Sequence, residues 1–167
     1  MQKILVSACL LGEPVRYDGG DCARHSSVLR QWQAEGRVVS ACPEVAGGLS
    51  VPRPAAEIDN GDAESALRRG SGVRRRDGSD VTDAFVAGAE KVLAECWRHR
   101  IKVAVLKDGS PSCGVSCVND GSFSGRKIKG QGLTARLLTR HGISVFSEQQ
   151  LEEAAKRLAE LDQAHGE

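Results

Sequence analysis

Three of the six cysteines in this 167-residue chain occupy equivalent places in the sequence. Cys9, Cys42 and Cys113 each come shortly after an apolar run that has the composition of a β-strand. Ligands bind outside the carboxyl ends of the strands in open α/β sheets, so a parallel arrangement would bring the three thiols to one edge of the sheet. They have no CxxC spacing, and isolated cysteines are most often small buried hydrophobic residues. The pattern therefore permits a shared metal site without requiring one.

The kind of metal depends on the ligands, and soft thiolates select zinc, copper(I) or iron–sulfur clusters. A structural zinc ion takes four protein ligands, and His25 is the only histidine near the expected site. A four-iron cluster held by three cysteines would instead leave one iron open as a Lewis acid. Cys96 lies on the apolar stripe of a predicted helix and Cys22 at an inward-facing helix start, which favours structural roles. Cys117, four residues after Cys113, remains ambiguous between a buried residue and a second ligand.

Alternating strands and helices must position these cysteines. Apolar or β-branched runs predict four strands, at Ile4–Ala8, Val38–Ala41, Ile101–Leu106 and Ile143–Phe146. Helical periodicity predicts helices at Asp21–Ala34, Val81–Arg100, Leu133–His141 and 148–162, the last one preceded by a capping pair of Ser147 and Gln150. We expect one α/β domain over residues 1–167, with an open, mostly parallel, Rossmann-like sheet, helices on both faces and the metal site at the C-terminal ends of its strands.

The segment Pro43–Ser79 has little periodicity and many Gly, Pro and Arg residues. It is interpreted as a long functional loop with some irregular structure. Its basic cluster is interpreted as a solvated loop face, and consists of Arg68, Arg69, Arg74, Arg75 and Arg76.

The composition favours a globular protein that acts on a small molecule. Hydrophobic residues make up 40% of the chain and charged residues 27%, with no apolar run near the length of a membrane span and no signal-peptide pattern. We therefore expect a cytoplasmic protein whose thiols stay reduced and available for metals or catalysis. The net charge of +1 argues against a broad nucleic-acid surface, and the aromatic content of 4% argues against stacking on single-stranded RNA.

Seven short motifs follow one another along the chain. They are Val6-Ser-Ala-Cys-Leu-Leu-Gly12, Arg16-Tyr-Asp-Gly-Gly20, Cys42-Pro-Glu-Val-Ala-Gly-Gly-Leu49, Lys107-Asp-Gly-Ser-Pro-Ser-Cys-Gly114, Asp120-Gly-Ser-Phe-Ser-Gly125, Gly132-Leu-Thr-Ala135 and Gly142-Ile-Ser-Val-Phe-Ser-Glu148. In this order, and over about residues 4–148, the chain resembles the thiouracil desulfidase family. The resemblance implies a [4Fe–4S] cluster on Cys9, Cys42 and Cys113, and removal of sulfur from thiolated uracil compounds without net redox change. Some members carry an additional cysteine where this chain has Val15, and its absence favours an iron with no protein ligand.

Glu44 and Ser110 are the candidate catalytic residues. The soft thiocarbonyl sulfur of a thiouracil would bind the open iron, so that water attacks the adjacent ring carbon and sulfide leaves. This hydrolysis needs a group that takes a proton from water and returns one to the leaving side. Glu44, two residues from Cys42, is the candidate for this role. The alternative interpretation is that Glu44 is only a solvated surface charge. Ser110 and Ser112 flank Pro111, and Ser110 is chosen to contact the substrate or relay the proton, with turn capping as the alternative.

The substrate-binding candidates fall into two groups. Tyr17 can stack on or hydrogen-bond a pyrimidine, and Asp18 and Lys107 are further candidates near the expected site. A nucleotide also needs a phosphate site, and the segment 122–130 offers hydroxyls and cations just before a predicted helix N-terminus, which is a common anion site. The phosphate candidates are Ser122, Ser124, Arg126 and Lys127, with an exposed basic hairpin as the alternative interpretation. Arg24, at the start of the first predicted helix, is a second option for the phosphate. The expected substrate is therefore 4-thiouridine monophosphate, thiouracil or both.

Two other functions remain open at this point. A non-catalytic metal- or persulfide-binding protein, such as a zinc-stabilised module, would need the cysteines but neither Glu44 nor Ser110. A desulfidase that acts on thiouridine within tRNA would use the same chemistry, although the near-zero net charge counts against a nucleic-acid substrate.

Overall fold

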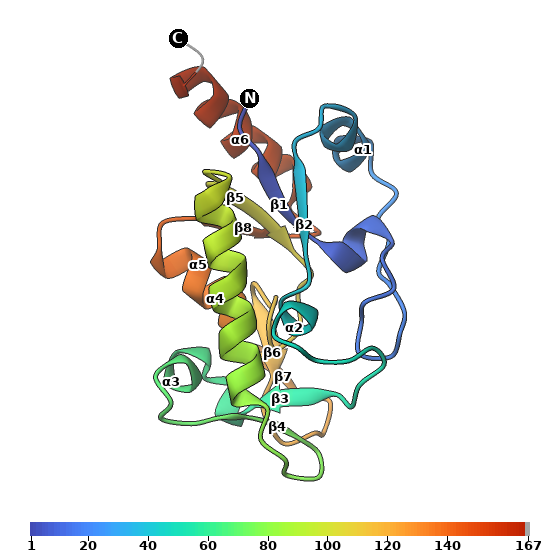
Figure 1. The fold of residues 1–167 in the computed structure, drawn as a ribbon, viewed down its shortest axis with the longest axis vertical. Helices are drawn as coiled ribbons and strands as arrows, with labels where there is room; N and C mark the ends of the chain where they lie inside the picture. Colours follow the sequence, from blue (N-terminus) through green and yellow to red (C-terminus); the bar gives the residue numbers. More distant parts are fainter. Residues whose placement is uncertain (166–167) are drawn as a thin grey trace.

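A four-stranded parallel sheet lies at the centre of the computed structural model, which describes residues 1–165 (Figure 1). Its strands are β1 (Ile4–Ser7), β2 (Val38–Ala41), β5 (Val103–Leu106) and β8 (Ser144–Ser147), in the order β2-β1-β5-β8. The register brings Ser7 opposite Ala41 and Leu106 opposite Ser147, so the carboxyl ends of the strands form one edge. All four predicted strands are confirmed, with ends that shift by at most two residues.

Helices cover both faces of this sheet (Figure 1). α4 (Thr82–Arg98) and α5 (Leu133–Arg140) pack on one face, and α1 (Ser27–Ala34) and α6 (Leu151–His165) pack on the other. Along β5, Ala104 and Leu106 contact the first layer, whereas Val103 and Val105 contact the second. Because successive side chains of a strand point to opposite faces, a strand covered on both sides is apolar throughout. This arrangement confirms the predicted α/β class.

The strand order reverses between β1 and β5. From β1 the chain passes outward to β2 on one side, and from β5 it passes outward to β8 on the other. Such a reversal opens a crevice beyond the carboxyl ends of the two central strands, because their connections leave in opposite directions. The 3₁₀ helix η1 (Ala8–Leu11), which contains Cys9, follows β1, and the loop that begins at Lys107 follows β5. Both segments therefore begin at the crevice.

The predicted helix Asp21–Ala34 is six residues too long, because α1 begins at Ser27. The hydroxyl of Ser26 caps the helix by accepting the amide of its second residue at 3.1 Å. Ahead of the cap, the amide of Cys22 donates to the carbonyl of Cys9 at 2.9 Å, which ties this segment to η1 instead. The prediction that Cys22 lies at a helix start is therefore wrong.

The other predicted helices agree more closely with the structure. The apolar stripe of α4 is buried as expected, at Phe85, Ala89, Val92 and Cys96. α6 begins at Leu151 rather than at residue 148, and the amide of Ser147 donates to Gln150 Oε1 at 2.9 Å, which is one half of the predicted capping pair. Within the described residues, no helix combines the length and apolar character that crossing a membrane requires.

The segment Pro43–Ser79, interpreted as a loop, contains short regular elements that the sequence did not indicate. They are α2 (Pro43–Ala46), η2 (Asp59–Gly61), α3 (Ala63–Leu67) and an antiparallel pair, β3 (Ala56–Ile58) with β4 (Val73–Arg75). A second antiparallel pair, β6 (Cys117–Asn119) with β7 (Lys127–Lys129), follows β5. Strands of three residues are too short to show a period. In the basic cluster, Arg74 pairs with Asp59 at 3.1 Å while about half exposed, which agrees with a solvated face.

α2 lies directly against α4 at two glycines. A Cβ atom on Gly47 would lie 2.0 Å from the carbonyl oxygen of Ala84, and one on Gly88 would lie 2.0 Å from that of Pro43. Only residues without a side chain allow the two backbones to approach this closely. The contact seats α2, and with it the residue after Pro43, beside the sheet edge.

We expect Gly88→Ala to lower the free energy of unfolding by about 1–3 kcal/mol, because the added methyl group forces α2 and α4 apart. Helix propensity alone predicts the opposite sign, since alanine is favoured over glycine inside a helix by about 1 kcal/mol. Urea denaturation of the variant and the wild-type protein measures the difference. An increase in stability would contradict the close contact.

Candidate functional site

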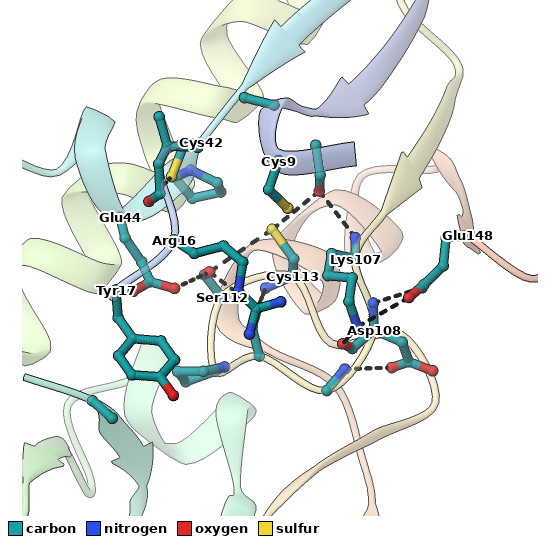
Figure 2. A pocket seen from close by; sticks show the side chains of 18 of the residues that line it. Cys9, Arg16, Tyr17, Cys42, Glu44, Lys107, Asp108, Ser112, Cys113 and Glu148 are labelled. Carbon is teal, nitrogen blue, oxygen red and sulfur yellow. Dashed lines mark hydrogen bonds and ion pairs between the residues drawn. The ribbon is translucent and has the colours of Figure 1, made fainter. Parts of the chain in front are cut away.

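The three predicted cysteines line one cavity of about 610 Å³ at the crevice between β1 and β5 (Figure 2). Cys9 lies in η1, Cys42 is the N-cap residue of α2 directly after β2, and Cys113 lies in the loop after β5. Figure 2 shows the side chains of Cys9 and Cys113 pointing toward one another, with Cys42 at the neighbouring strand end. The topology thus brings together three thiols that are far apart in the sequence.

The protein environment keeps these thiols neutral when no metal is bound. Burial raises the pKa of Cys113 to about 12 and that of Cys9 to about 11. Burial also raises the pKa of Cys42, although amide hydrogen bonds from α2 oppose the shift. Metals bind thiolates, so loading the site would release protons and place negative charge in the cavity.

Nearby cationic side chains can offset the negative charge of the thiolates. Arg16 and Lys107 act against the raised pKa of Cys9, and Arg53 acts against that of Cys42. Three soft sulfur donors, a cavity with room for several atoms and nearby positive charges fit an anionic iron–sulfur cluster. Within residues 1–165, no three His, Cys, Asp or Glu side chains meet closely enough to hold a single metal ion.

Glu44 forms one wall of the cavity and both of its carboxylate oxygens have partners. Arg53 Nε donates to Oε1 at 3.0 Å, and Ser112 Oγ donates to Oε2 at 2.8 Å. The Arg53 side chain is only 3% exposed, and its remaining nitrogens donate to the carbonyls of Ser50 and Val15, both at 3.0 Å. The carboxylate is therefore held in one orientation beside the loop that carries the third cysteine.

Ser110 and Ser112 form a chain of hydroxyls that ends on Glu44. Because Ser112 donates its proton to Glu44, the 3.3 Å contact between the two serines makes Ser110 the donor to Ser112. The hydroxyl of Ser110 also accepts the amide of Cys113 at 2.7 Å, which is the turn-capping role considered from the sequence. Ser112, and not Ser110, makes the direct contact with Glu44.

The Cys113 loop is fixed from several sides. Ser7 Oγ donates to Cys113 Sγ at 3.4 Å and accepts the amide of Lys107 at 3.0 Å. The Oδ1 atom of Asp108 accepts amides further along the loop, including that of Val115 at 2.7 Å. Burial alone would raise the pKa of Asp108, but hydrogen bonds from Ser116 and neighbouring amides outweigh it and hold the pKa below its usual range.

Three of the predicted substrate-binding residues line the cavity: Tyr17, Lys107 and Lys127. Tyr17 is 42% exposed, and Lys127 Nζ donates to Asn119 Oδ1 at 3.3 Å. The other five do not line it: Asp18, Arg24, Ser122, Ser124 and Arg126. These five are exposed, and Asp18 and Ser122 make local turn contacts, with the amide of Gly20 and with Asp120 respectively. Arg24, like His25, precedes the start of α1 and is exposed.

The predicted anion site at the N-terminus of α5 is occupied by the protein itself. The amide of Leu133 donates to the carbonyl of Pro111 at 2.8 Å, and the amides of Thr134 and Ala135 donate to that of Ser112. These are the donors that a phosphate would need. The interpretation of this helix end as a phosphate site is therefore wrong, and the helix end instead holds the Cys113 loop.

Sequence reasoning missed four residues of the site: Ser7, Arg16, Arg53 and Glu148. Glu148 directly follows β8, so the positional rule that selects the cysteines also applies to it, but the helical pattern of 148–162 predicts it to be a helix residue. Ser7 is the polar last residue of an apolar strand, which is a usable signal. Arg53 carried no local signal, because its partners lie far apart along the chain.

We expect Arg53→Met to lower the free energy of unfolding by about 3–5 kcal/mol, because it leaves the carboxylate of Glu44, whose side chain is only 14% exposed, without its cation. In the double variant Arg53→Met/Glu44→Gln part of this loss should be recovered, since no charge is left unpaired. Denaturant unfolding of the two variants tests this. If Arg53→Met lowers the free energy of unfolding by less than about 1 kcal/mol, as expected for a surface ion pair, the Arg53–Glu44 pair is not the structural contact described above.

Comparison with known proteins adds three similarities. A family model described as 2-thiouracil desulfurase matches residues 4–150. The chain is 43% identical to the uncharacterized protein YbbK of Bacillus subtilis (strain 168) over 148 residues, which cover 89% of this chain and 97% of that protein. A solved structure of the [4Fe–4S]-dependent thiouracil desulfidase TudS superposes with a TM-score of 0.87 at 49% identity, covering 95% of this chain and 99% of that chain.

Proposed function

The chain belongs to the 2-thiouracil desulfurase family, and from this premise we propose that it is a [4Fe–4S]-dependent desulfidase acting on thiouracil compounds. The observation that carries the proposal is the convergence of Cys9, Cys42 and Cys113 on one cavity that Glu44 also lines. A non-catalytic metal- or persulfide-binding protein would have no use for a carboxylate fixed beside the thiols. We further propose that it works in a reducing compartment such as the cytoplasm, where such thiols remain available.

The three cysteines would hold the cluster. With only three protein ligands, such a cluster supplies one iron open to the soft thiocarbonyl sulfur, where it acts as a Lewis acid. Ser7, through its contact with Cys113 Sγ, orients one of the sulfur ligands. Val15 lies at the cavity wall, and its carbonyl accepts from Cys42 Sγ at 3.8 Å. In this chain that position offers no further thiol.

The proposed reaction is hydrolytic and needs no electrons. Water adds its oxygen to the thiocarbonyl carbon, the carbon–sulfur bond breaks, and a carbonyl compound and hydrogen sulfide result. Glu44 accepts a proton from the attacking water and returns it to the departing sulfur. Arg53 holds the carboxylate in place, and the chain from Ser110 through Ser112 to Oε2 gives the proton a path along the cavity wall.

We propose 4-thiouridine monophosphate, thiouracil or both as substrates. The half-exposed ring of Tyr17 offers a face on which a pyrimidine can stack. Lys127 is the one member of the predicted phosphate group that lines the cavity, so it is the candidate for contacting a nucleotide phosphate. A free base would leave that cation unused.

The test is anaerobic reconstitution followed by turnover of 2-thiouracil, 4-thiouracil and 4-thiouridine monophosphate. We expect bound iron and sulfide in equal amounts, release of sulfide, and incorporation of oxygen from ¹⁸O-labelled water into the pyrimidine carbonyl. Comparison of kcat/KM between base and nucleotide ranks the substrates. Stoichiometric zinc without sulfide release would overturn the enzyme proposal, and unlabelled product would overturn the hydrolytic step alone.

A further inference from the structure

A second ion pair, Lys107 with Glu148, lies on the opposite side of the cavity from Glu44 (Figure 2). Lys107 directly follows β5 and Glu148 directly follows β8, and these neighbouring strands end in the register pair Leu106 and Ser147. The sheet itself therefore places the two side chains opposite one another. Figure 2 shows Cys9 and Cys113 between this pair and Glu44, with Cys42 on the Glu44 side, so each of two facing walls carries one ion pair.

Hydrogen bonds and burial fix the geometry of the Lys107–Glu148 pair. The Glu148 side chain is only 5% exposed, with Oε2 3.0 Å from Lys107 Nζ and Oε1 accepting the amide of Asp108 at 2.9 Å. The ammonium of Lys107 also donates to the carbonyl of Asp108 at 2.9 Å. An ammonium carries three N–H donors, and these contacts use two of them. Two fixed acceptors therefore orient the remaining donor of Lys107.

Lys107 remains accessible from the cavity. Its side chain is 28% exposed, it lines the cavity, and its charge acts on Cys9. A buried carboxylate that anchors the ammonium without enclosing it leaves a charged donor aimed at a bound molecule. Such a donor prefers a hard oxygen acceptor over a soft sulfur.

We propose that Lys107 recognises the exocyclic oxygen of the pyrimidine that is not being replaced, and that Glu148 is the positioning residue that holds Lys107 for this contact. The inference rests on the proposed function and adds to it how the site tells the two exocyclic positions of the ring apart. Sulfur is directed to the thiols, and oxygen to the ammonium on the facing wall. The protein would thereby select rings that carry one sulfur and one oxygen.

The test compares kcat/KM for the mono-thiouracil that the wild-type enzyme turns over faster with kcat/KM for 2,4-dithiouracil. Lys107→Met should lower kcat/KM for the mono-thiouracil about 10- to 100-fold, as expected for loss of a charged hydrogen bond. The same variant should lower kcat/KM for 2,4-dithiouracil less. The ratio of kcat/KM for the mono-thiouracil to kcat/KM for 2,4-dithiouracil should therefore fall. A second readout is binding of uracil to the cluster-loaded protein by equilibrium dialysis, where Kd should rise about 10-fold.

Further variants separate recognition from folding. Glu148→Gln should lower the same ratio, and Lys107→Met/Glu148→Gln, which leaves no buried charge unpaired, should lower it no further than Lys107→Met alone. Lys102→Met, the same change at the exposed opposite end of β5, should leave the ratio unchanged. An active wild-type enzyme whose ratio survives the Lys107 changes would overturn this inference alone. A wild-type protein that turns over neither compound would instead refute the proposed function.

Discussion

Replacing Cys9 by serine is expected to abolish cluster binding and, with it, all desulfidase activity. Cys9 follows the central strand β1 and faces Cys113 across the cavity. A serine hydroxyl is a hard and weakly acidic donor, whereas iron–sulfur clusters are held by thiolates. Of the three proposed ligands only Cys42 and Cys113 would remain, and Cys117, which also lines the cavity, stands four residues from Cys113 and not in the place of Cys9. Iron and sulfide analysis after anaerobic reconstitution, together with the visible absorption of the cluster, measures the effect.

The matched control is Cys96→Ala, which removes a thiol from the core between α4 and the sheet. Burial raises the pKa of Cys96 to about 12, and the residue lies outside the cavity. This variant should lose some stability but keep its cluster. A Cys9→Ser protein with a full complement of iron and sulfide would remove Cys9 from the ligand set.

Glu44→Gln is expected to keep the cluster and lower kcat about 10²- to 10⁴-fold, the usual contribution of a general acid–base group. The amide has nearly the shape of the carboxylate, but its single oxygen can accept from only one of the two donors, Arg53 or Ser112, so the variant should lose some stability. Arg53 keeps the carbonyls of Ser50 and Val15 as acceptors, so the cavity should keep its form. The amide cannot take a proton from water. Steady-state turnover of the best thiouracil substrate, normalised to iron content, measures the change.

Glu64→Gln is a suitable control, because Glu64 also forms ion pairs with arginines but lies outside the cavity. It should retain nearly full activity per cluster. If Glu44→Gln turns over substrate at the wild-type rate, proton transfer must be assigned to another group. If it loses the cluster as well, Glu44 is a structural residue of the metal site.

The sheet could be predicted from the sequence because its strands are buried on both faces. Such strands are continuous apolar runs, and four of them stand out at Ile4, Val38, Ile101 and Ile143. The hairpin strands β3, β4, β6 and β7 have three residues each, and their burial depends on contacts with the start of α4 and α5. No local pattern encodes those contacts. The start of α1 was misplaced because hydrogen bonds to η1 override helix formation in the segment before Ser26.

The site was predictable where function follows strand ends and unpredictable where it depends on distant partners. Cys9 and Cys42 stand next to strands, so topology alone placed them together. Arg53 is defined by contacts with Val15, Ser50 and Glu44, which only the folded chain brings within reach. The predicted use of the α5 N-terminus as an anion site was wrong for a similar reason, because the donors there are already used by the backbone of the Cys113 loop.

The hydrogen bonds between the start of α5 and the Cys113 loop also bear on how the protein matures. Pro111 and Ser112 are fixed by backbone donors, and the Asp108 carboxylate gathers several amides of the same loop. All of these contacts are made within the protein, so much of the entropy cost of ordering the loop is met when the chain folds. A finished cluster can then be transferred into a preorganised cavity after folding, without any segment having to fold around it. We therefore expect the folded apoprotein to accept a cluster, so that synthesis of the chain and delivery of its cofactor can be separate events.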